Sequence, residues 1–375
     1  MTRDRQARRQ GRDRRTRKQS EKASIEHSKK TRKHKNQRVF TSYAKSKYDV
    51  DCGAGHSILQ NKDAEDIRVY LQNPNGVLGM DTKYDDRRVL LQLQEWDVNI
   101  IALPETNRNW KVPWLQDRWE SEVQRVWRHA KVFNSSINTD QRNTKIQGGV
   151  SLIVTNRWAS RVVDHGEDPL GRWAWVQLRG KSNEMFTCMA MYQPNPGSPD
   201  NGPETVWTQQ YQHRLQEVLD KEGDTESIID PREKILLDMN EWISQNIGAN
   251  DQFVLLTDAN QSLDDNTTTY SLRKLIQDNT LHSTMELKHP GESVRSTNRG
   301  SKTIDHILIK NIPSDQVKRS GQLPFELGFH TDHRGMFTDI DVHSILGIYV
   351  EDPIEQAQRR LSSKNKKVEA STLRK

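Results

Sequence analysis

Short apolar runs separated by polar turns constrain this 375-residue chain more than any other feature. Eight runs of about five to eight residues are rich in Val, Ile and aromatic side chains, which is typical of β-strands. The predicted strands are Ile67 to Gln72, Val98 to Leu103, Gly149 to Val154, Trp173 to Leu178, Met185 to Tyr192, Phe253 to Thr257, Thr303 to Ile309 and Met336 to Val342. They supply enough strand for two β-sheets.

Three stretches between these runs repeat apolar residues at spacings of three or four, which predicts amphipathic helices. Their apolar positions are Val89, Leu93 and Trp96; Trp207, Tyr211, Leu215 and Leu219; and Leu236, Met239, Trp242 and Ile243. Asp85 and Asp86 stand where the first helix begins, and Pro231 stands where the third begins, both of which favour a helix start. We expect these helices to pack on the sheets and to carry no chemistry.

The N-terminal segment differs in composition from the rest. Residues 1–40 contain 16 Lys and Arg against 4 Asp and Glu, a net charge of +12, whereas the whole chain carries +6. Such a segment has too few apolar side chains to order itself, and its charge suits a polyanion such as nucleic acid. A solubilising tail or a nuclear localisation signal has the same composition. We expect a basic disordered tail and linker over 1–66, a domain over 67–345, and a charged helix or tail over 346–375.

Several classes of protein are excluded by composition. No run approaches the ~18 apolar residues that span a bilayer, and the N-terminus lacks the apolar segment of a secretory signal. Two cysteines are too few for a disulfide scaffold. We therefore expect a nuclear or otherwise intracellular protein that is not secreted and has no membrane partner.

Polar clusters follow or begin the predicted strands. Each is ordinary by itself: the Asn-Pro-Asn-Gly segment is a turn, a Glu after a strand is often solvated, Asp-x-Asn is often an Asx turn, and a lone His is usually structural. The clusters are Gln72-Asn73-Pro74-Asn75-Gly76, Pro104-Glu105-Thr106, Tyr192-Gln193-Pro194-Asn195, Asp258-Ala259-Asn260, Asp305-His306 and Asp332-His333. His306 faces away from Asp305 by strand alternation, so we do not expect it to act.

The order of these clusters resembles the endonuclease/exonuclease/phosphatase superfamily. Its pattern is Asn-x-x-Gly, then Glu, Tyr or His, Asp-x-Asn, Asp and Asp-His, and the resemblance runs from about Val69 to Ile340. The Tyr-x-Pro-Asn segment at Tyr192 looks like abasic-site endonucleases and the endonuclease domains of non-LTR retrotransposons. The resemblance implies an α/β (α+β) fold, a four-layer sandwich of two mixed β-sheets packed face to face with helices outside.

The same resemblance implies a metal-dependent phosphodiesterase, most closely a DNA endonuclease of retroelement type. Mg²⁺ is the implied cofactor, with Mn²⁺ as the alternative, and nucleic acid, DNA first, is the implied partner. The implied metal ligands are Asn73, Glu105 and Asp332; the catalytic residues are Tyr192, Asp258, Asn260, Asp305 and His333; and the substrate-binding residues are Asn75 and Asn195. Within this set Asp305 should fix the ring of His333, and Asp258 should orient or deprotonate water.

Two departures from the family pattern are visible. Thr257 stands where the family more often has Gly, which leaves the position of Asp258 less defined, and Asn75 stands where repair enzymes often carry Asp, which predicts weaker Mg²⁺ binding. Two other functions remain open. One is an RNA nuclease or phosphatase on the same site, and the other is a catalytically silent nucleic-acid-binding relic.

Overall fold

Two β-sheets form the centre of the structure, a computed structural model that describes residues 51–78, 86–138, 143–180, 184–200, 202, 204–220, 229–265 and 268–346. The seven-stranded sheet has the order β1-β12-β13-β2-β3-β5-β4, and the six-stranded sheet has the order β10-β11-β9-β8-β7-β6. All elements below belong to one unit that begins at Gly53. The basic segment 1–50 and the predicted C-terminal helix beyond 346 lie outside the described residues.

The strands of the seven-stranded sheet are β1 (Ala54–Gly55), β2 (Asp66–Leu71), β3 (Ile100–Pro104), β4 (Lys131–Ser135), β5 (Val150–Val154), β12 (Val317–Gln322) and β13 (Met336–Asp341). Those of the six-stranded sheet are β6 (Val162–Glu167), β7 (Trp173–Arg179), β8 (Met185–Tyr192), β9 (Gln252–Asp258), β10 (His282–Ser283) and β11 (Asp305–Lys310). The eight strands predicted from the sequence are thereby confirmed. The five others are short, polar or edge strands whose sequences lack a continuous apolar run.

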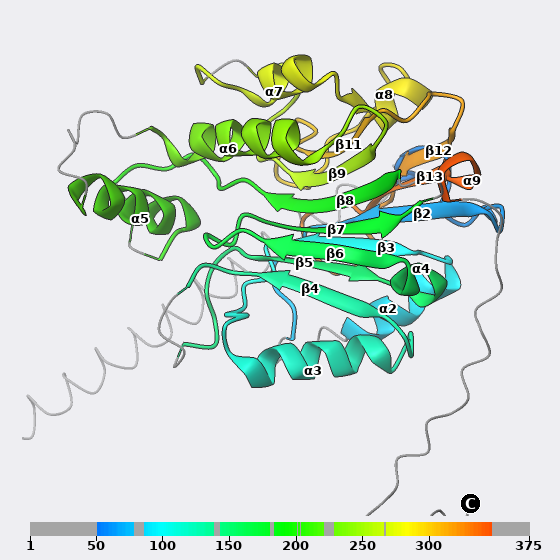
Figure 1. The fold of residues 1–375 in the computed structure, drawn as a ribbon, viewed down its shortest axis with the longest axis horizontal. Helices are drawn as coiled ribbons and strands as arrows, with labels where there is room; N and C mark the ends of the chain where they lie inside the picture. Colours follow the sequence, from blue (N-terminus) through cyan, green and yellow to red (C-terminus); the bar gives the residue numbers. More distant parts are fainter. Residues whose placement is uncertain are drawn as a thin grey trace, which may run out of the picture. The chain divides into compact units, whose positions relative to one another are not determined.

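Helices cover the outer face of each sheet, which gives four layers and confirms the predicted sandwich (Figure 1). α2 (Asp86–Glu95) and α3 (Pro113–Gln124) pack on the seven-stranded sheet. α6 (Pro231–Asn246) and α7 (Leu272–Asn279) pack on the six-stranded sheet. The remaining helices are α4 (Asn156–Ser160), α5 (Val206–Asp220), α8 (Thr284–Lys288) and α9 (His343–Leu346).

Strand alternation sorts side chains between these layers. Val69 and Ile100 point into the core between the sheets, whereas Tyr70 and Ile101 point outward under α2 and α3. In the other sheet, Cys188 enters the central core while its neighbours on the strand pack under α6. Because both faces of the inner strands are buried, they read as continuous apolar runs.

The three predicted helices are confirmed as α2, α5 and α6. The predicted stripe of α5 is not a buried face, however, because Tyr211 and Leu215 are half-buried and Leu219 is exposed. α6 begins as its sequence indicates: Pro231 occupies the first turn, and the side chain of Asp230 accepts a hydrogen bond from Arg232 N at 2.7 Å. A Pro loses nothing there, since the first amides of a helix have no partner in the helix. Asp85 lies outside the described residues, but Asp86 is the first residue of α2.

The expected start of the domain at Ile67 is later than the first paired strand. Ala54 and Gly55, which we expected in the linker, pair with Gln322 and Gly321 of β12. Gly55 permits this approach, because a Cβ there would lie 2.8 Å from Ser320 O. Where the domain begins is determined here by backbone contact, which leaves no apolar signal in the sequence.

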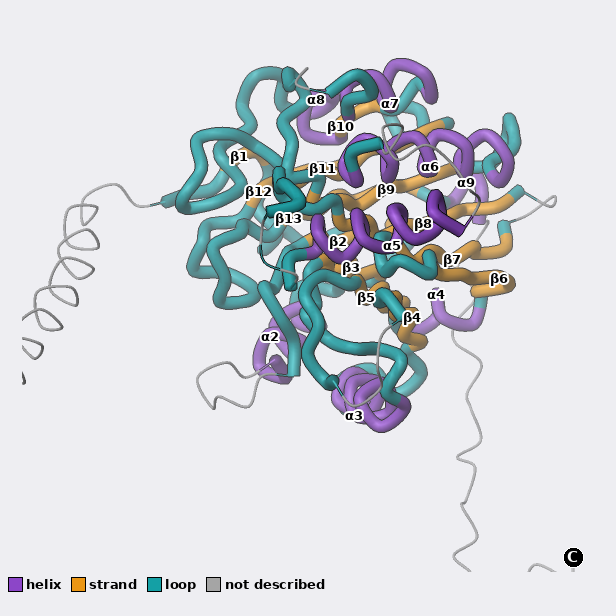
Figure 2. The backbone as a smooth tube through the Cα atoms, turned by 90° about the vertical axis from the view of Figure 1, so that its left-hand side faces the viewer, coloured by secondary structure: helices purple, strands orange, loops and turns teal. Residues whose placement is uncertain are grey.

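Each sheet contains a parallel pair of strands, β2 with β3 and β8 with β9. Parallel neighbours end at the same edge, so the residues that follow these four strands meet at one end of the sandwich. Loops gather over that end (Figure 2). In the part of the chain that the structure describes, no helix is both long enough and apolar enough to cross a lipid bilayer.

Candidate active site

Asn73, just past the end of β2, connects the two sheets. Its Nδ2 donates to Glu105 Oε2 and to Asp258 Oδ2, both at 2.7 Å, and lies 3.4 Å from His333 Nε2. Its Oδ1 accepts from Asn75 N at 2.8 Å. Glu105 follows β3 and Asp258 ends β9. One buried amide therefore joins groups that come from four separate segments of the chain.

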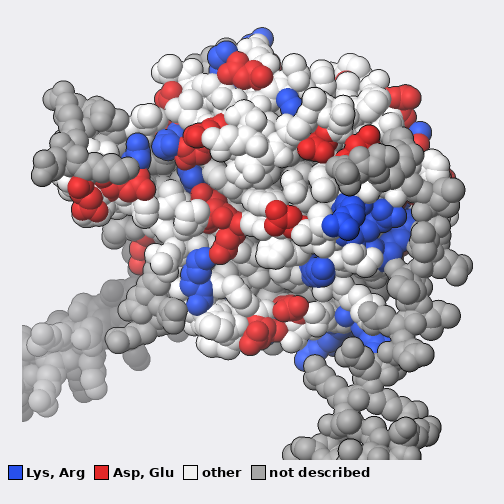
Figure 3. Space-filling view, viewed as in Figure 1, with Lys and Arg blue, Asp and Glu red and all other residues white. Residues whose placement is uncertain are grey.

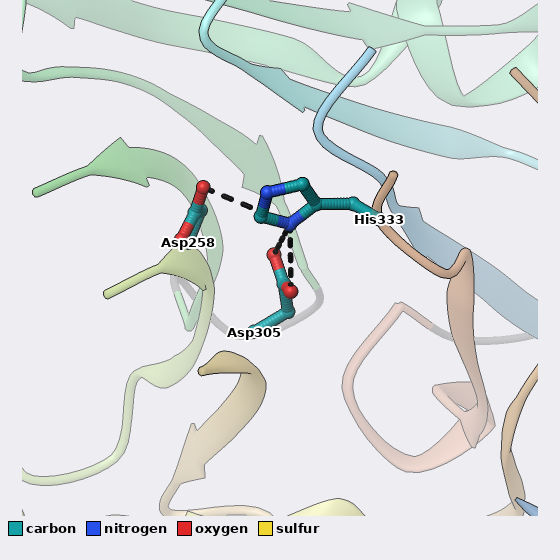
Figure 4. Close-up of side chains that lie close together, drawn as sticks. All are labelled: Asp258, Asp305 and His333. Atoms are coloured by element: carbon teal, nitrogen blue, oxygen red, sulfur yellow. Dashed lines mark hydrogen bonds and ion pairs between the residues drawn. The ribbon is translucent and has the colours of Figure 1, made fainter. Parts of the chain in front are cut away.

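His333 is held by Asp305 (Figure 4). Its Nδ1 lies 2.9 Å from Asp305 Oδ2 and 3.2 Å from Oδ1, and Asp258 Oδ2 lies 4.0 Å away. Asp305 is the first residue of β11 and stands directly opposite Asp258 in the strand pairing. With Nδ1 engaged by Asp305, the Nε2 atom faces Asn73 and the centre of the site. This is the orienting pair that the family resemblance predicts.

Burial and crowded charge shift the pKa values of this group. Burial, together with the charge of Asp305, raises the pKa of Asp258 to about 8. Burial alone would lower the pKa of His333, but the carboxylates of Asp305 and Asp258 outweigh it and raise that pKa to about 10. At neutral pH His333 is therefore an imidazolium, and Asp258 changes its protonation within the physiological range.

Tyr192 is the last residue of β8 and borders the same cluster. It hydrogen-bonds with Glu105 and Asn260, and burial with the nearby charges of Glu105 and Asp258 raises its pKa well above the ordinary value. Asn260 donates its own amide to Gln193 O at 2.7 Å. The hydroxyl is thus a proton donor at any physiological pH.

Four residues around the site adopt left-handed backbone conformations that only glycine adopts freely. They are Asn75, Glu105, Asn107 and Asn260, with φ of 51°, 56°, 54° and 45°. Gly76 N donates to Glu105 O at 2.9 Å, and Thr106 N donates to Gly149 O at 3.1 Å, which holds the Glu105 turn in place. Such strain concentrates at functional sites, where it aims a side chain.

Seven of the ten residues named from the sequence lie in this cluster: Asn73, Glu105, Tyr192, Asp258, Asn260, Asp305 and His333. Asn75 borders it, since its amide bonds Asn73 and its Oδ1 accepts from Asn107 at 3.3 Å. Asn195 is exposed on the loop that follows β8.

Asp332 occupies a different position from the one expected for a metal ligand. Its carboxylate lies 3.6 Å from Arg299 Nε and is about one quarter exposed. Among the contacts between described residues, none joins it to Asn73 or Glu105; it acts on His333 only through its charge. The physical reason is local: Asp332 stands in a bend before β13, and its carboxylate turns toward Arg299 while the ring of His333 turns toward Asp305.

The donor atoms of the cluster fit a divalent cation. Carboxylate oxygens of Asp258 and Asp305 lie within 4.8 Å of each other, and Glu105 is the third carboxylate, bonded to the same amide as Asp258. His333 supplies no ligand atom while it is an imidazolium. Among the described residues, no Lys or Arg forms an ion pair with these three carboxylates. One imidazolium cannot balance them, and a hard cation prefers such oxygen ligands. Asn73 presents its nitrogen to the carboxylates, so ligation through its oxygen requires the amide to turn over.

Other residues that hold the site together have no obvious signal in the sequence. Gln72 Nε2 donates to Phe329 O at 3.1 Å and to His333 O at 3.0 Å, and its Oε1 accepts from Phe329 N at 2.7 Å. This fixes the loop that carries His333 against the end of β2. Gln72 belongs to the segment Gln72-Asn73-Pro74-Asn75-Gly76, but in the sequence this segment indicates only a turn.

Thr257 and His306 lie inside the paired strands. Thr257 stands opposite His306 and Met191, so the strand ladder fixes its backbone. We expected Thr257 to leave the position of Asp258 less defined, but the strand pairing holds the backbone of both residues. His306 faces away, as predicted, and its Nε2 lies 3.0 Å from Gln261 O, with burial lowering its pKa.

A group of basic side chains lies on the side of α4 (Figure 3). Arg157, Arg161 and Arg179 belong to α4, its end and the end of β7, and Arg161 Nη1 donates to Arg179 O at 3.3 Å. α4 follows β5, which runs antiparallel to β3, so this group lies at the opposite end of the sheets from the site.

No protein-family model matches the sequence, and no curated protein matches it either. Solved structures do match. An AP endonuclease from Leishmania major has a TM-score of 0.53 at 12% identity, covering 78% of this chain and 92% of its own.

Two further solved structures have lower scores. The endonuclease domain of TRAS1, a telomere-specific non-LTR retrotransposon, has a TM-score of 0.46 at 14% identity and covers 76% and 100% of the two chains. An endonuclease/exonuclease/phosphatase family protein from Leptotrichia buccalis has 0.43 at 13%, covering 73% and 99%. At these identities the similarity concerns the fold.

Proposed function

Because the chain has the endonuclease/exonuclease/phosphatase fold, we propose that it is a Mg²⁺-dependent phosphodiesterase, and specifically a DNA endonuclease of retroelement type. The observation that carries the proposal is the convergence on Asn73 of two carboxylates and an imidazole from both sheets. Hydrolysis of a phosphodiester needs an activated water, neutralisation of charge and a donor for the leaving oxygen. The cluster offers a group for each.

A divalent cation would be held by Glu105 and by Asn73 after its amide turns over. It would neutralise phosphate charge and assist the departing oxygen. Asp332 would contribute its charge from the outside. Because Asn75 is a neutral amide, we expect weaker Mg²⁺ binding than an Asp at that position would give.

The residues of the chain divide the proton chemistry between them. In its deprotonated form, which predominates above its pKa of about 8, Asp258 can take a proton from water. The imidazolium of His333, kept charged by Asp305, donates from Nε2 to a phosphate oxygen. The hydroxyl of Tyr192 and the second amide hydrogen of Asn260 are further donors to the phosphate. All four groups are held in place before substrate arrives, which lowers the cost of reorganisation.

DNA is the proposed substrate for two reasons. The N-terminal 40 residues carry a net charge of +12, which suits binding to the phosphate backbone. The Tyr192-Gln193-Pro194-Asn195 segment resembles endonucleases that act on DNA. Asn75 and Asn195, both exposed beside the site, are proposed to contact the nucleic acid. A nuclear location follows from this substrate and is proposed with it.

Nicking of supercoiled plasmid with Mg²⁺ tests the proposal. We expect the parent protein to nick, EDTA to abolish nicking, and Glu105→Gln or His333→Ala to reduce the rate about 10²- to 10⁴-fold, the usual contribution of such groups. Glu120→Gln and His165→Ala, which alter exposed side chains on α3 and β6, are the matched controls and should retain the parental rate.

Absence of nicking by the parent, or equal nicking by the parent and the two site variants, would exclude the endonuclease. The same proteins should then be assayed with RNA oligonucleotides and phosphomonoesters. Turnover there would indicate an RNA nuclease or phosphatase, and metal-independent binding without cleavage would indicate a silent relic.

A further inference from the structure

Arg232 lies buried at the start of α6, between two loops that carry site residues, and it was not singled out from the sequence. It is 4% exposed. Its backbone is fixed by Pro231 in the first turn and by Asp230, whose Oδ1 accepts from Arg232 N at 2.7 Å. The helix start therefore sets where the guanidinium reaches.

The contacts of Arg232 join the two loops. Its Nη1 donates to Pro194 O at 3.2 Å, and its Nη2 donates to Asn260 O at 3.0 Å. Its own carbonyl accepts from Gln193 Nε2 at 2.9 Å. One loop follows β8 and the other follows β9, so a single side chain spans the ends of the parallel pair.

These loops hold the groups assigned to the chemistry. Asn260 Nδ2 donates to Gln193 O at 2.7 Å, and Gln193 N donates to Asp258 O at 2.9 Å. Tyr192 precedes the first loop and hydrogen-bonds with Asn260. A shift of either loop would therefore move the hydroxyl of Tyr192 relative to the carboxylate of Asp258.

Arg232 differs from the other buried arginine of this region. Arg172 forms ion pairs with Asp168 at 2.8 Å and with Asp238 at 2.6 Å. Among the described residues, no carboxylate lies within ion-pair distance of Arg232, which gives its donors to main-chain carbonyls instead. Burial lowers the pKa of Arg232 and outweighs the charges of Asp230, Asp265 and Asp258, which act on it from beyond ion-pair distance. Its charge is therefore only partly compensated, and a role in stability alone explains it poorly. The planar fork of Arg reaches its two acceptors from two nitrogens at a fixed separation, whereas Lys has to donate to both from one flexible nitrogen.

We propose that Arg232 is a positioning residue of the active site, which fixes Tyr192 and Asn260 relative to Asp258 by holding the two loops at a set distance. The proposal rests on the proposed phosphodiesterase function for its kinetic consequence. Its structural consequence is independent of that function.

Arg232→Lys tests the kinetic consequence, with Lys234→Met as the matched control on the same helix. Lys234 pairs with Asp238 and touches neither loop in the described contacts. In the plasmid assay we expect Arg232→Lys to lower kcat about 10- to 100-fold with KM within about twofold, because misplaced groups slow the reaction more than they weaken binding. Lys234→Met should keep the parental kcat.

An equal kcat for Arg232→Lys and the parent would overturn the proposal. So would a raised KM with an unchanged kcat, which would indicate ground-state binding. Arg232→Met, measured beside Arg232→Lys for thermal unfolding, separates stability from position: a loss of kcat in Arg232→Lys at an unchanged unfolding midpoint supports positioning.

Amide hydrogen exchange decides the structural consequence whether or not the protein cleaves DNA. Arg232→Lys should exchange at least about tenfold faster at the amides of Gln193 and Asn260, while the amides within β8 and β9 keep their parental rates. Unchanged exchange at both loop amides would overturn the proposal that Arg232 holds the loops, even if the parent protein is active. If the parent protein has no nuclease activity but Arg232→Lys still exchanges faster, the proposed function is excluded and the role of Arg232 in holding the two loops stands.

Discussion

Arg68 and Asp339 form a buried charge pair in the seven-stranded sheet, and Asp258, Asp305 and His333 form a second buried group at the strand ends. Both groups are covered by protein, and both join segments far apart in the sequence. The first group is balanced in charge and fully hydrogen-bonded. The second includes Asp258, whose pKa is raised to about 8, so the group gains an excess of negative charge as pH rises above that value.

The balanced group shows what a structural ion pair looks like in this fold. Arg68 donates Nε and Nη2 to the two oxygens of Asp339 at 2.6 and 2.8 Å, and Nη1 donates to Ile58 O and Trp96 O. Arg319 adds a weaker contact to Asp339 at 3.4 Å. Since the site has no comparable cation among the described residues, the difference points to a charge that the site receives from outside.

The largest effect is expected at the balanced pair. Arg68→Met leaves Asp339 buried with only its distant partner, and removal of one member of a buried pair costs about 3–5 kcal/mol. Urea unfolding should show this loss. Arg68→Met combined with Asp339→Asn should recover part of it, and an equally unstable double variant would show that Arg68 contributes packing rather than charge.

A smaller effect of opposite sign is expected at the site. At pH 9 in EDTA, Asp258→Asn removes one of the crowded carboxylates and should stabilise the fold by about 1–2 kcal/mol, the equivalent of roughly one pKa unit or slightly more. Added Mg²⁺ should remove the advantage. Asp305→Asn is the contrasting control, which should destabilise the protein because it takes away the partner of His333. If Asp258→Asn does not stabilise the protein in EDTA, the negative charge of the site is already balanced by other groups.

The smallest effect is expected at Asp66, which belongs to neither group. Its Oδ2 is buried without a partner among the described residues, and burial with the charges of Asp63 and Asp339 raises its pKa to about 6. The folded state therefore holds this proton more tightly than the unfolded state, so Asp66 costs stability as pH rises from about 4 to 6. Asp66→Asn should stabilise the protein by about 1 kcal/mol at pH 7 and by nothing near pH 3.5.

Chemical unfolding at several pH values measures this difference. Asp315→Asn, at an exposed position, should show no such pH dependence. A gain from Asp66→Asn that stays constant between pH 3.5 and 7 would exclude titration of Asp66 as its cause.

The inner strands could be predicted because burial on both faces leaves an uninterrupted apolar run, as in β8 and β9. β12 could not, because its sequence Val317-Lys-Arg-Ser-Gly-Gln322 is held by pairing with β13 and by the approach of Gly55. β6 was missed for a related reason, since most of its residues are exposed at a sheet edge.

The site was predicted where chemistry demands an ionisable group and missed where a residue works through contacts. Asp305 and His333 were named together because the order of the polar clusters resembles the superfamily pattern, and the structure brings the two side chains into contact. Gln72 and Arg232 hold backbone carbonyls, and no local pattern distinguishes an Arg or Gln that does this from an ordinary surface residue. Asp332 was assigned to the metal through its neighbour, although its side chain points to Arg299.

The assembly of the site from two parallel strand pairs has a consequence during synthesis. Asn73 and Glu105 are made early, but His333 is added only after the residues of β1 to β12. Neither sheet alone holds a complete set of groups. The cluster is therefore complete only after the segment that carries His333 has been made and has docked against both sheets.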